Sequence, residues 1–230
     1  MTDRTDHADE LARSWEANAE LWVRAVRGNR IASRAAATDS AILTAIAAHR
    51  PHWVLDIGCG EGWLVRRLVR EAGCRAVGID GSTALVDAAR AADPEGDYRK
   101  ISFEAFVADA DLAGGPYDVA VFNYALFDGI AADLLATAAS RLVPGGVVIV
   151  QTLHPWIDAG ASYHDGWRVE DFGGFAEPGE SWTPMPWYFR TLGSWMALIR
   201  DAGLALEDLA EPGSDRGEPL SMLLTAGRTA

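Results

Sequence analysis

The sequence is poor in cysteine, in basic residues and in long apolar runs. Its two cysteines, Cys59 and Cys74, allow at most one disulfide in 230 residues, and the chain does not begin with a basic and then apolar secretion signal. No stretch approaches the roughly 18 consecutive apolar residues of a membrane-spanning helix. The 20 Lys and Arg are outnumbered by 33 Asp and Glu, and the formal net charge of −13 repels phosphate backbones and anionic lipids. We therefore expect a cytoplasmic protein that binds neither nucleic acid nor a membrane.

Residues that commonly hold a metal ion are scattered. The two cysteines lie 15 positions apart, and the histidines show no close ligand spacing. The histidines are His7, His49, His52, His154 and His164. We predict no metal site.

Short apolar runs alternate with segments of helical spacing from residue 53 onward. This alternation is typical of an α/β protein with a mainly parallel, doubly wound sheet of the Rossmann-like type. Two further strands near the end of the chain are joined by a short connection, which predicts an antiparallel hairpin at the sheet edge. We expect seven strands in all, at residues 53–57, 75–80, 103–107, 117–122, 147–152, 204–209 and 220–225.

Two flanking regions break this alternation. Before the first strand, apolar residues recur at helical spacing, which predicts a helical cap, with Asp39 as the amino-terminal cap of its second helix. After the fifth predicted strand the chain is rich in proline, glycine and aromatic residues without a sustained period, which indicates an insertion. We expect one domain over residues 1–230, divided into a helical cap (1–50), a cofactor-binding core (51–152), a substrate lid (153–190) and a C-terminal helix and hairpin (191–230).

A glycine-rich loop follows the first predicted strand. Gly58, Gly60 and Gly62 allow a tight turn and let a ligand lie on main-chain N–H groups. A dinucleotide-binding loop places its third glycine three residues after the second, whereas here the gap is two and Glu61 occupies it. Asp80 ends the second strand and can accept both hydroxyls of a ribose. Acids beside the loop disfavour a pyrophosphate, so the residues indicate an adenosine ligand without phosphate and with a positive charge.

Three segments together resemble the class I S-adenosylmethionine-dependent methyltransferases. They are Val54-Leu55-Asp56-Ile57-Gly58-Cys59-Gly60-Glu61-Gly62, Val77-Gly78-Ile79-Asp80 and Leu142-Val143-Pro144-Gly145-Gly146. Each lies at a predicted strand or its end, in the family's order, and the resemblance covers about residues 52–152. Segments 14–22 and 185–192 are also similar to a bacterial subgroup of these enzymes, for which no acceptor follows from the residues.

The resemblance implies S-adenosylmethionine as the cofactor and assigns the residues that bind it. The glycine loop would line the methionine part, Asp80 would hold the ribose, Asp109 would accept from the adenine amino group, and Asn123 and Tyr124 would border the methyl group. Asp56 would either brace the loop or contact the ligand ammonium. The predicted cofactor-binding residues are Asp56, Gly58, Cys59, Gly60, Asp80, Gly81, Ser82, Asp109, Ala110, Asn123 and Tyr124.

Candidate residues for the acceptor and for catalysis come from outside the three segments. His154 leaves the fifth strand and is either a general base or a hydrogen-bonded loop residue. Aromatic residues of the insertion form either a lid or a small satellite core, and Trp22 belongs to the cap or to the core. Arg168 and Arg190 could anchor a carboxylate, while the aromatic density leaves an amine acceptor open. The predicted substrate residues are Trp22, Trp156, Tyr163, Trp187, Tyr188 and Arg190.

We therefore expect an enzyme that transfers a methyl group from S-adenosylmethionine to oxygen, nitrogen or carbon of a small molecule, as a monomer or homodimer. One alternative is an NAD(P)-dependent oxidoreductase on a similar sheet. The other is a regulatory module that binds S-adenosylmethionine without turnover.

Overall fold

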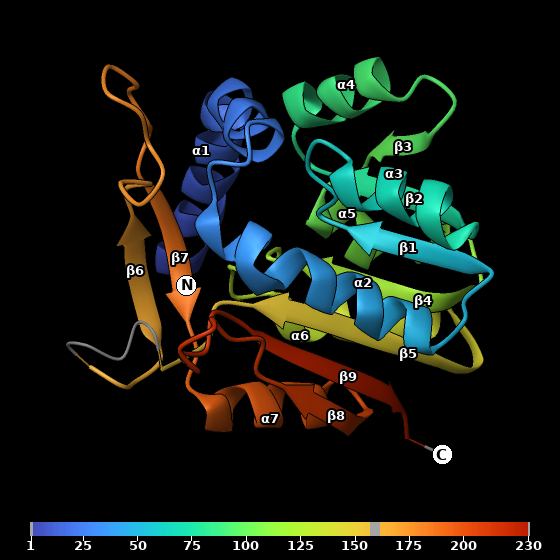
Figure 1. Ribbon diagram of the computed structural model, residues 1–230. Helices are drawn as coiled ribbons and strands as arrows, with labels where there is room; N and C mark the ends of the chain where they lie inside the picture. The colour runs from blue at the N-terminus through green and yellow to red at the C-terminus, as the bar shows by residue number, and fades with distance from the viewer. Residues whose placement is uncertain (1, 157–161, 230) are drawn as a thin grey trace.

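The computed structural model describes residues 2–156 and 162–229, and its core is one seven-stranded sheet (Figure 1). Its strands are β1 (Trp53–Ile57), β2 (Arg75–Asp80), β3 (Asp97–Lys100), β4 (Tyr117–Asn123), β5 (Leu142–Thr152), β8 (Leu204–Ala210) and β9 (Met222–Arg228). The strand order is β3-β2-β1-β4-β5-β9-β8, with β1 to β5 parallel and β9 antiparallel to both β5 and β8. The predicted doubly wound sheet with its antiparallel hairpin is confirmed.

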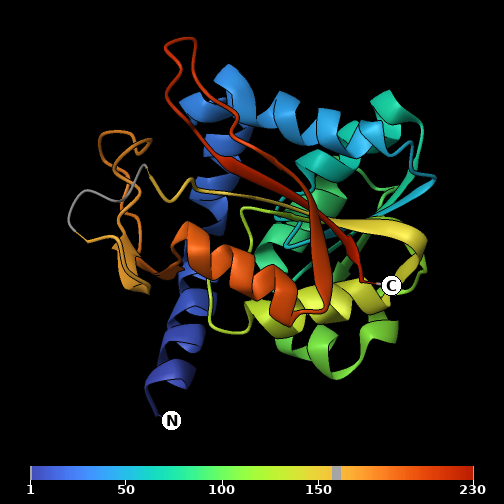
Figure 2. The same ribbon diagram turned by 90° about the horizontal axis from the view of Figure 1, so that it is seen from below.

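Helices cover both faces of this sheet (Figure 2). They are α1 (Thr2–Arg27), the π-helix η1 (Arg34–Thr38), α2 (Asp39–Ala48), α3 (Trp63–Arg67), η2 (Leu68–Ala72), α4 (Thr83–Ala92), α5 (Phe103–Ala108), η3 (Ala110–Ala113), α6 (Ala131–Ser140) and α7 (Leu192–Asp201). Side chains alternate along each strand, so Val54 packs in the cluster with α2, α3 and α4, and Leu55 in the cluster with α5, α6 and α7. The two faces thus carry separate hydrophobic cores.

The prediction of a third strand at residues 103–107 is wrong. Residues 103–107 belong to helix α5, whose first turn is capped by Ser102 because its hydroxyl accepts from Ala105 N at 3.2 Å. The third strand is instead β3, at residues 97–100, which is polar because it pairs only with β2 at the sheet edge. This shift changes which residues follow a strand end near the site.

The aromatic insertion contains regular structure that the sequence pattern did not predict. β6 (Gly166–Glu170) and β7 (Met185–Phe189) form a separate two-stranded antiparallel sheet. Figure 1 shows helix α1 beside this hairpin, and Leu11 of α1 packs in one cluster with Phe172, Met185 and Trp187. We call α1 together with residues 162–190 the roof.

Polar contacts as well as apolar ones join the two parts of the roof. The buried Asn18 side chain donates to Thr183 O at 2.8 Å and accepts from Thr183 N at 2.8 Å. Arg30 donates to both carboxylate oxygens of Glu180, each at 3.0 Å. This pairing holds the pKa of the Glu180 carboxyl down, at about 2. Helix α1 and the insertion therefore form one unit, although more than 140 residues separate them in the chain.

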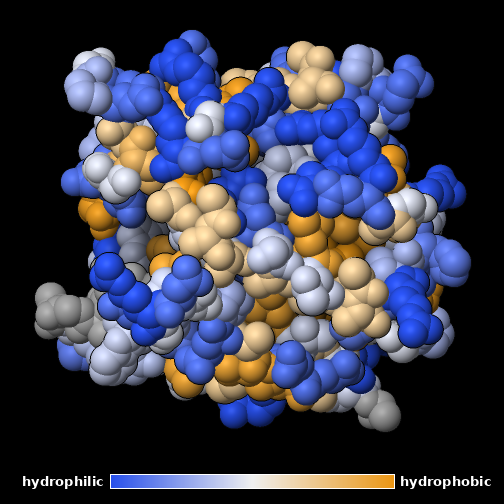
Figure 3. Space-filling view, viewed as in Figure 1, coloured by the Kyte–Doolittle hydropathy of each residue, from blue (hydrophilic) through white to orange (hydrophobic). Residues whose placement is uncertain are grey.

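One face of the molecule carries both polar and apolar side chains (Figure 3). Figure 3 shows hydrophilic and hydrophobic side chains interspersed across one face, with apolar side chains at its centre. Among the described residues, no helix is both long enough and apolar enough to cross a membrane.

Candidate active site

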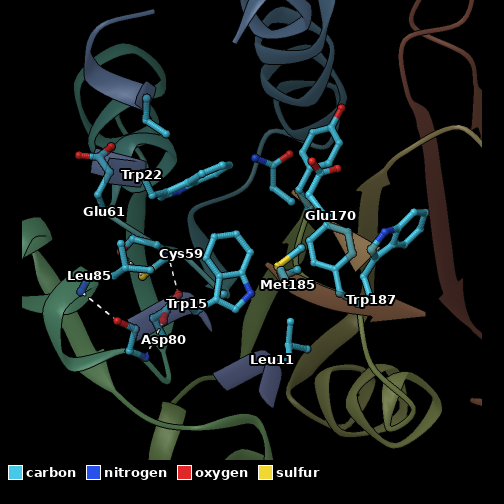
Figure 4. Close-up of a pocket in the computed structure, with 18 of the residues that line it drawn as sticks. Leu11, Trp15, Trp22, Cys59, Glu61, Asp80, Leu85, Glu170, Met185 and Trp187 are labelled. Atoms are coloured by element: carbon cyan, nitrogen blue, oxygen red, sulfur yellow. Dashed lines mark hydrogen bonds between the residues drawn. The ribbon is translucent and has the colours of Figure 1, made fainter. Parts of the chain in front are cut away.

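A cavity of about 510 Å³ lies between the carboxyl ends of the parallel strands and the roof. On one side it is lined by loops that follow β1, β2, β3 and β4, which we call the floor: residues 58–63, 80–82, 102–104 and 123–125. The roof and the segment around η1 line most of the rest, and Leu85, Phe127, Asp128 and Leu153 complete the lining. Figure 4 shows Trp15 between the two sides, which are marked by Cys59, Asp80 and Leu85 on the floor side and by Glu170, Met185 and Trp187 opposite. This is the place predicted for a ligand in an open α/β sheet.

The glycine loop after β1 requires glycine for two different reasons. Gly58 and Gly60 have φ of 78° and 56°, in the left-handed region that side chains disfavour. A Cβ at Gly58 would lie 2.6 Å from the Ala125 Cβ, whereas one at Gly60 would meet only Trp22 Nε1, at 3.7 Å across the cavity. Gly58 is thus needed for packing, and Gly60 leaves main chain open to a ligand.

Asp80 is held rigidly at the end of β2. Its Oδ2 accepts from Gly60 N and its Oδ1 from Ser82 N, both at 2.8 Å. Burial raises the pKa of this carboxyl, while the two backbone N–H groups act in the opposite direction. Because each oxygen accepts one backbone hydrogen bond, each keeps a lone pair for a second donor. Two adjacent hydroxyls are suited to this arrangement.

Ser82 connects the floor to the roof. Its hydroxyl caps α4 by accepting from Leu85 N at 3.2 Å, and it donates to Glu16 Oε2 of α1 at 2.6 Å. Ser82 is thus the amino-terminal cap of α4. Because Ser82 lies two positions after Asp80, this hydrogen bond holds α1 close to the end of β2.

Asp56 is a buried acid without a hydrogen bond to its Oδ1 from any described residue. Burial, together with the nearby Asp80, raises the pKa of Asp56 to about 8. A loop brace would accept backbone N–H groups, as Asp80 does, and the structure shows no such bond to this oxygen. An unsatisfied buried acceptor is costly, which fits a partner supplied from outside the protein, although Asp56 itself does not line the cavity.

Glu61 differs from Asp56 although it also lies in the loop. Its fully buried carboxylate accepts from Arg27 Nε at 2.7 Å and from Arg66 Nη2 at 2.7 Å. The expectation that Glu61 adds negative charge for a cationic ligand is therefore wrong, because two guanidinium groups neutralise it. Glu61 instead ties α1 to the start of α3.

Asp109 and Ala110 lie outside the residues that line the cavity. Asp109 is exposed, and its Oδ1 accepts from Asp111 N at 3.1 Å at the start of η3. Their assignment to the cofactor depended on a strand at 103–107, which is a helix. Ser102, Phe103 and Glu104, which follow the true third strand β3, line the cavity instead.

Two predicted residues after β4 do line the cavity. Asn123 Oδ1 accepts from Gln151 Nε2 at 3.1 Å, which fixes the orientation of its amide. Tyr124 has a positive φ of 54°, and burial raises the pKa of its hydroxyl. Cys59 also lines the cavity, and burial raises the pKa of its thiol. Neither Tyr124 nor Cys59 is therefore predisposed to ionise at neutral pH.

The structure separates the six predicted substrate residues into two groups. Trp22 and Trp187 line the cavity. Trp156 is 72% exposed, and the hydroxyl of Tyr163 accepts from Leu192 N at 2.9 Å. Arg190 is buried and donates to the carbonyl oxygens of Leu126 and Asp128. Four of the six lie outside the lining of the cavity: Trp156, Tyr163, Tyr188 and Arg190.

His154 also lies outside the lining of this cavity. It is buried, its Nε2 lies 2.8 Å from Glu211 Oε1, and its Nδ1 accepts from Trp156 N at 3.1 Å. Both ring nitrogens are thus engaged by the protein. The geometry favours the structural role of His154 over the catalytic one.

The sheet and the floor match known methyltransferases. Residues 54–146 match a family model described as a methyltransferase domain. Residues 54–146 carry a methyltransferase domain, and the chain has the class I methyltransferase fold. The resemblance to the class I S-adenosylmethionine-dependent methyltransferases is confirmed, and the comparisons favour methyl transfer over the oxidoreductase alternative. No curated protein matches the sequence.

Solved methyltransferases share the fold at low identity. The 1,6-didemethyltoxoflavin-N1-methyltransferase of Burkholderia thailandensis, solved with 1,6-didemethyltoxoflavin and S-adenosylhomocysteine bound, is 18% identical. Its TM-score is 0.67, and the match covers 99% of this chain and 91% of that chain. An S-adenosylmethionine-dependent methyltransferase of Mesorhizobium loti is 25% identical, with a TM-score of 0.56 and coverage of 80% and 96% respectively.

The match to the methyltransferase family model ends at residue 146, before residues 162–190 of the roof. Several lining residues that the sequence pattern missed lie in the roof. The missed residues include Trp15, Glu170, Phe172, Phe175 and Met185. Only Trp15 had a sequence signal, as part of the apolar stripe of α1. The others lie in a segment without periodicity, and only tertiary packing brings them to the methyltransferase site.

Proposed function

We propose that the protein transfers a methyl group from S-adenosylmethionine to oxygen, nitrogen or carbon of a small-molecule acceptor. The observation that carries this proposal is the fixed Asp80 carboxylate, which faces a large cavity beside a glycine loop. The spacing of the loop also differs from that of a dinucleotide-binding loop, because Gly62 follows Gly60 by two residues rather than three.

The residues present fit S-adenosylmethionine. Asp80 would accept the two ribose hydroxyls, and Gly60 would provide open main chain beside the methionine part. Asp56, with one oxygen unpartnered, stays the predicted partner of the ammonium group, although it does not line the cavity. Ser102 and Phe103, in place of Asp109 and Ala110, would border the adenine. When bound, the cofactor supplies an activated methyl group on a positively charged sulfur.

The protein's own contribution is alignment and the exclusion of water. Asn123 and Tyr124 line the cavity after β4 and border the transferred methyl group. The roof acts as the lid, since it covers the floor and is joined to it through Glu16 and Arg27. Displacement at an activated methyl depends mainly on holding the attacking atom in line. No step requires His154.

A small molecule fits this enclosure better than a macromolecule. The acceptor side is a covered cavity, and the net charge of −13 opposes nucleic acid. The Burkholderia thailandensis enzyme was solved with 1,6-didemethyltoxoflavin bound, which supports a small-molecule acceptor here. The same charge supports a cytoplasmic protein that does not bind membranes, and the oligomeric state, monomer or homodimer, stays a prediction.

Calorimetric titration with S-adenosylhomocysteine, with a reduced nicotinamide dinucleotide in parallel, tests the cofactor. We expect micromolar binding of the first ligand alone. Asp80→Ala weakens it by roughly 1–3 kcal/mol because charged hydrogen bonds to buried hydroxyls are lost. Asp109→Ala is the matched control and leaves the affinity unchanged, since Asp109 is exposed outside the cavity.

Two results would contradict the proposal. Binding of the dinucleotide alone would support the oxidoreductase, and equal losses in the two variants would remove Asp80 from the ribose site. Turnover is then measured as a gain of one methyl on candidate acceptors by mass spectrometry. Cofactor binding without turnover on any acceptor would support the regulatory module instead.

A further inference from the structure

The acceptor side of the cavity has little positive charge to offer. Arg34 is the one basic side chain that lines the cavity in the described part of the chain. Its guanidinium donates to both oxygens of Asp39, at 2.8 and 3.0 Å, and stacks 4.3 Å from the centre of the Trp63 ring. The predicted capping role of Asp39 is thus replaced by this pairing. An acceptor carboxylate would find no unpaired cation here.

A carboxylate faces this side of the cavity instead. Glu170 ends β6 and lines the cavity opposite Asp80 (Figure 4). Its Oε1 accepts from Phe172 N at 2.6 Å, which fixes the carboxylate in place. No basic side chain of the described residues forms an ion pair with it, and its Oε2 accepts no hydrogen bond from them. Glu170 therefore offers a ligand an oriented hydrogen-bond acceptor whose negative charge is not paired with any basic side chain that the structure describes.

Aromatic rings extend from this carboxylate to the glycine loop, from Phe172, two residues after Glu170, to Trp22, whose Nε1 would lie 3.7 Å from a Cβ on Gly60. Trp15, Trp22, Phe175 and Phe172 contact one another in a closed circuit, with centroid separations of 5.2, 5.9, 6.0 and 6.5 Å. All four line the cavity, and the rings meet at 66° to 82°. Ring faces carry negative electrostatic potential and attract cations. The ring circuit and Glu170 thus both favour a positively charged ligand.

We propose that this site recognises an acceptor through a basic nitrogen, held as a cation by Glu170 beside the aromatic circuit. This inference rests on the proposed function and narrows its acceptor to flat or compact amines. The recognised nitrogen and the methylated atom need not be the same. The carboxylate on Glu170 sets the preference for charge, and the rings set the preference for an apolar body.

Two matched probe pairs test the charge preference in protein saturated with S-adenosylhomocysteine. The pairs are tryptamine with indole-3-propionate and phenethylamine with 3-phenylpropionate. Calorimetry is expected to show each amine binding at least about tenfold tighter than its acid, the effect of one favourable against one unfavourable charge contact. Glu170→Gln keeps the shape and lowers amine affinity by about tenfold. Asp171→Asn, at the exposed neighbouring carboxylate, changes neither amine nor acid binding.

The outcomes separate this inference from the proposed function. Equal binding of amine and acid, absence of amine binding at millimolar concentration, or an unchanged Glu170→Gln variant would overturn the cation preference while S-adenosylhomocysteine still binds. Failure of S-adenosylhomocysteine itself to bind would overturn the proposed function. Trp22→Leu is the second variant, and it lowers the affinity for both amines without altering the sign of the Glu170 effect.

Discussion

The floor and the roof of the cavity are built in different ways. The floor consists of short loops between parallel strands, and its key contacts join residues of neighbouring strand ends, such as Gly60 N to Asp80. The roof joins segments more than 140 residues apart through side chains, such as Asn18 to Thr183 and Arg30 to Glu180. The shape of the floor therefore follows from the backbone of the sheet. The shape of the roof depends on contacts between individual side chains.

A buried acid in β1, next to the floor, makes the largest predicted difference between the two regions. The pKa of Asp56 is raised from 3.8 to about 8, so the native state binds a proton that the unfolded state releases. The contribution of Asp56 to stability without ligand is then greatest at low pH and falls as pH rises from about 4 to about 8, with a slope of up to about 1.4 kcal/mol per pH unit.

Urea unfolding at pH 5, 6, 7 and 8 checks this expectation, with Asp56→Asn as the comparison. The variant lacks the titrating carboxyl, so its stability falls less steeply. Parallel curves for the two proteins would show that Asp56 is ionised throughout this range. Glu170→Gln is the control from the roof, and it leaves the slope of the wild-type protein unchanged.

Glycine positions in the two regions also differ in their tolerance of a side chain. Gly58→Ala forces a Cβ to 2.6 Å from Ala125 at a φ of 78°, which we expect to cost about 2–4 kcal/mol from strain and overpacking. Gly174→Ala in the roof meets no atom within 4 Å and is expected to stay within about 0.5 kcal/mol of wild type. The free energy of unfolding of the two variants is measured by urea denaturation. Equal losses in both would show that the floor and the roof do not differ in their tolerance of a side chain.

The hydrogen bonds within the roof are expected to contribute less. Asn18→Ala leaves the Thr183 N–H without its side-chain partner, whereas the Ser14 hydroxyl still donates to Thr183 O at 3.1 Å, and we expect a loss of about 1–3 kcal/mol. Hydrogen exchange is expected to quicken in residues 183–189 and not in β1, because the floor does not depend on Asn18. Faster exchange throughout both regions would mean that the roof and floor unfold together.

The smallest effect is expected at His154, where both ring nitrogens are engaged away from the cavity. His154→Ala retains cofactor affinity and changes turnover by less than about threefold, because no proton transfer passes through it. The pH profile of turnover is measured beside it. A tenfold or larger fall in turnover with an altered pH profile would restore the general base.

The sequence predicts the residues of the floor better than those of the roof. Gly58, Gly60 and Asp80, which line the cavity, could be predicted because a strand, a glycine loop and a strand-end acid are local patterns with fixed spacing. Asp109 lies outside the lining because the predicted strand before it is a helix. The short apolar run at 103–107 suits a strand or a helix equally, while the true strand at the sheet edge is polar. Ser102, as a helix cap, was the available signal.

The roof could not be predicted in the same way. Glu170 and Phe172 reach the cavity because β6 and β7 pair and because Leu11 of α1 packs beside them. These contacts arise between distant segments, and no periodicity in either segment encodes them. The same gap explains the exposed Trp156, which was assigned to the substrate only because it is aromatic.

Four of the nine tryptophans line the cavity: Trp15, Trp22, Trp63 and Trp187. Indole emission responds to the polarity around the ring, so a ligand that displaces water from the cavity changes the intrinsic fluorescence of the protein. The floor and the roof each contribute, since Trp63 lies at the start of α3 and the other three lie in the roof. Single Trp→Phe variants would therefore show, without any attached dye, which part of the cavity a given ligand has entered.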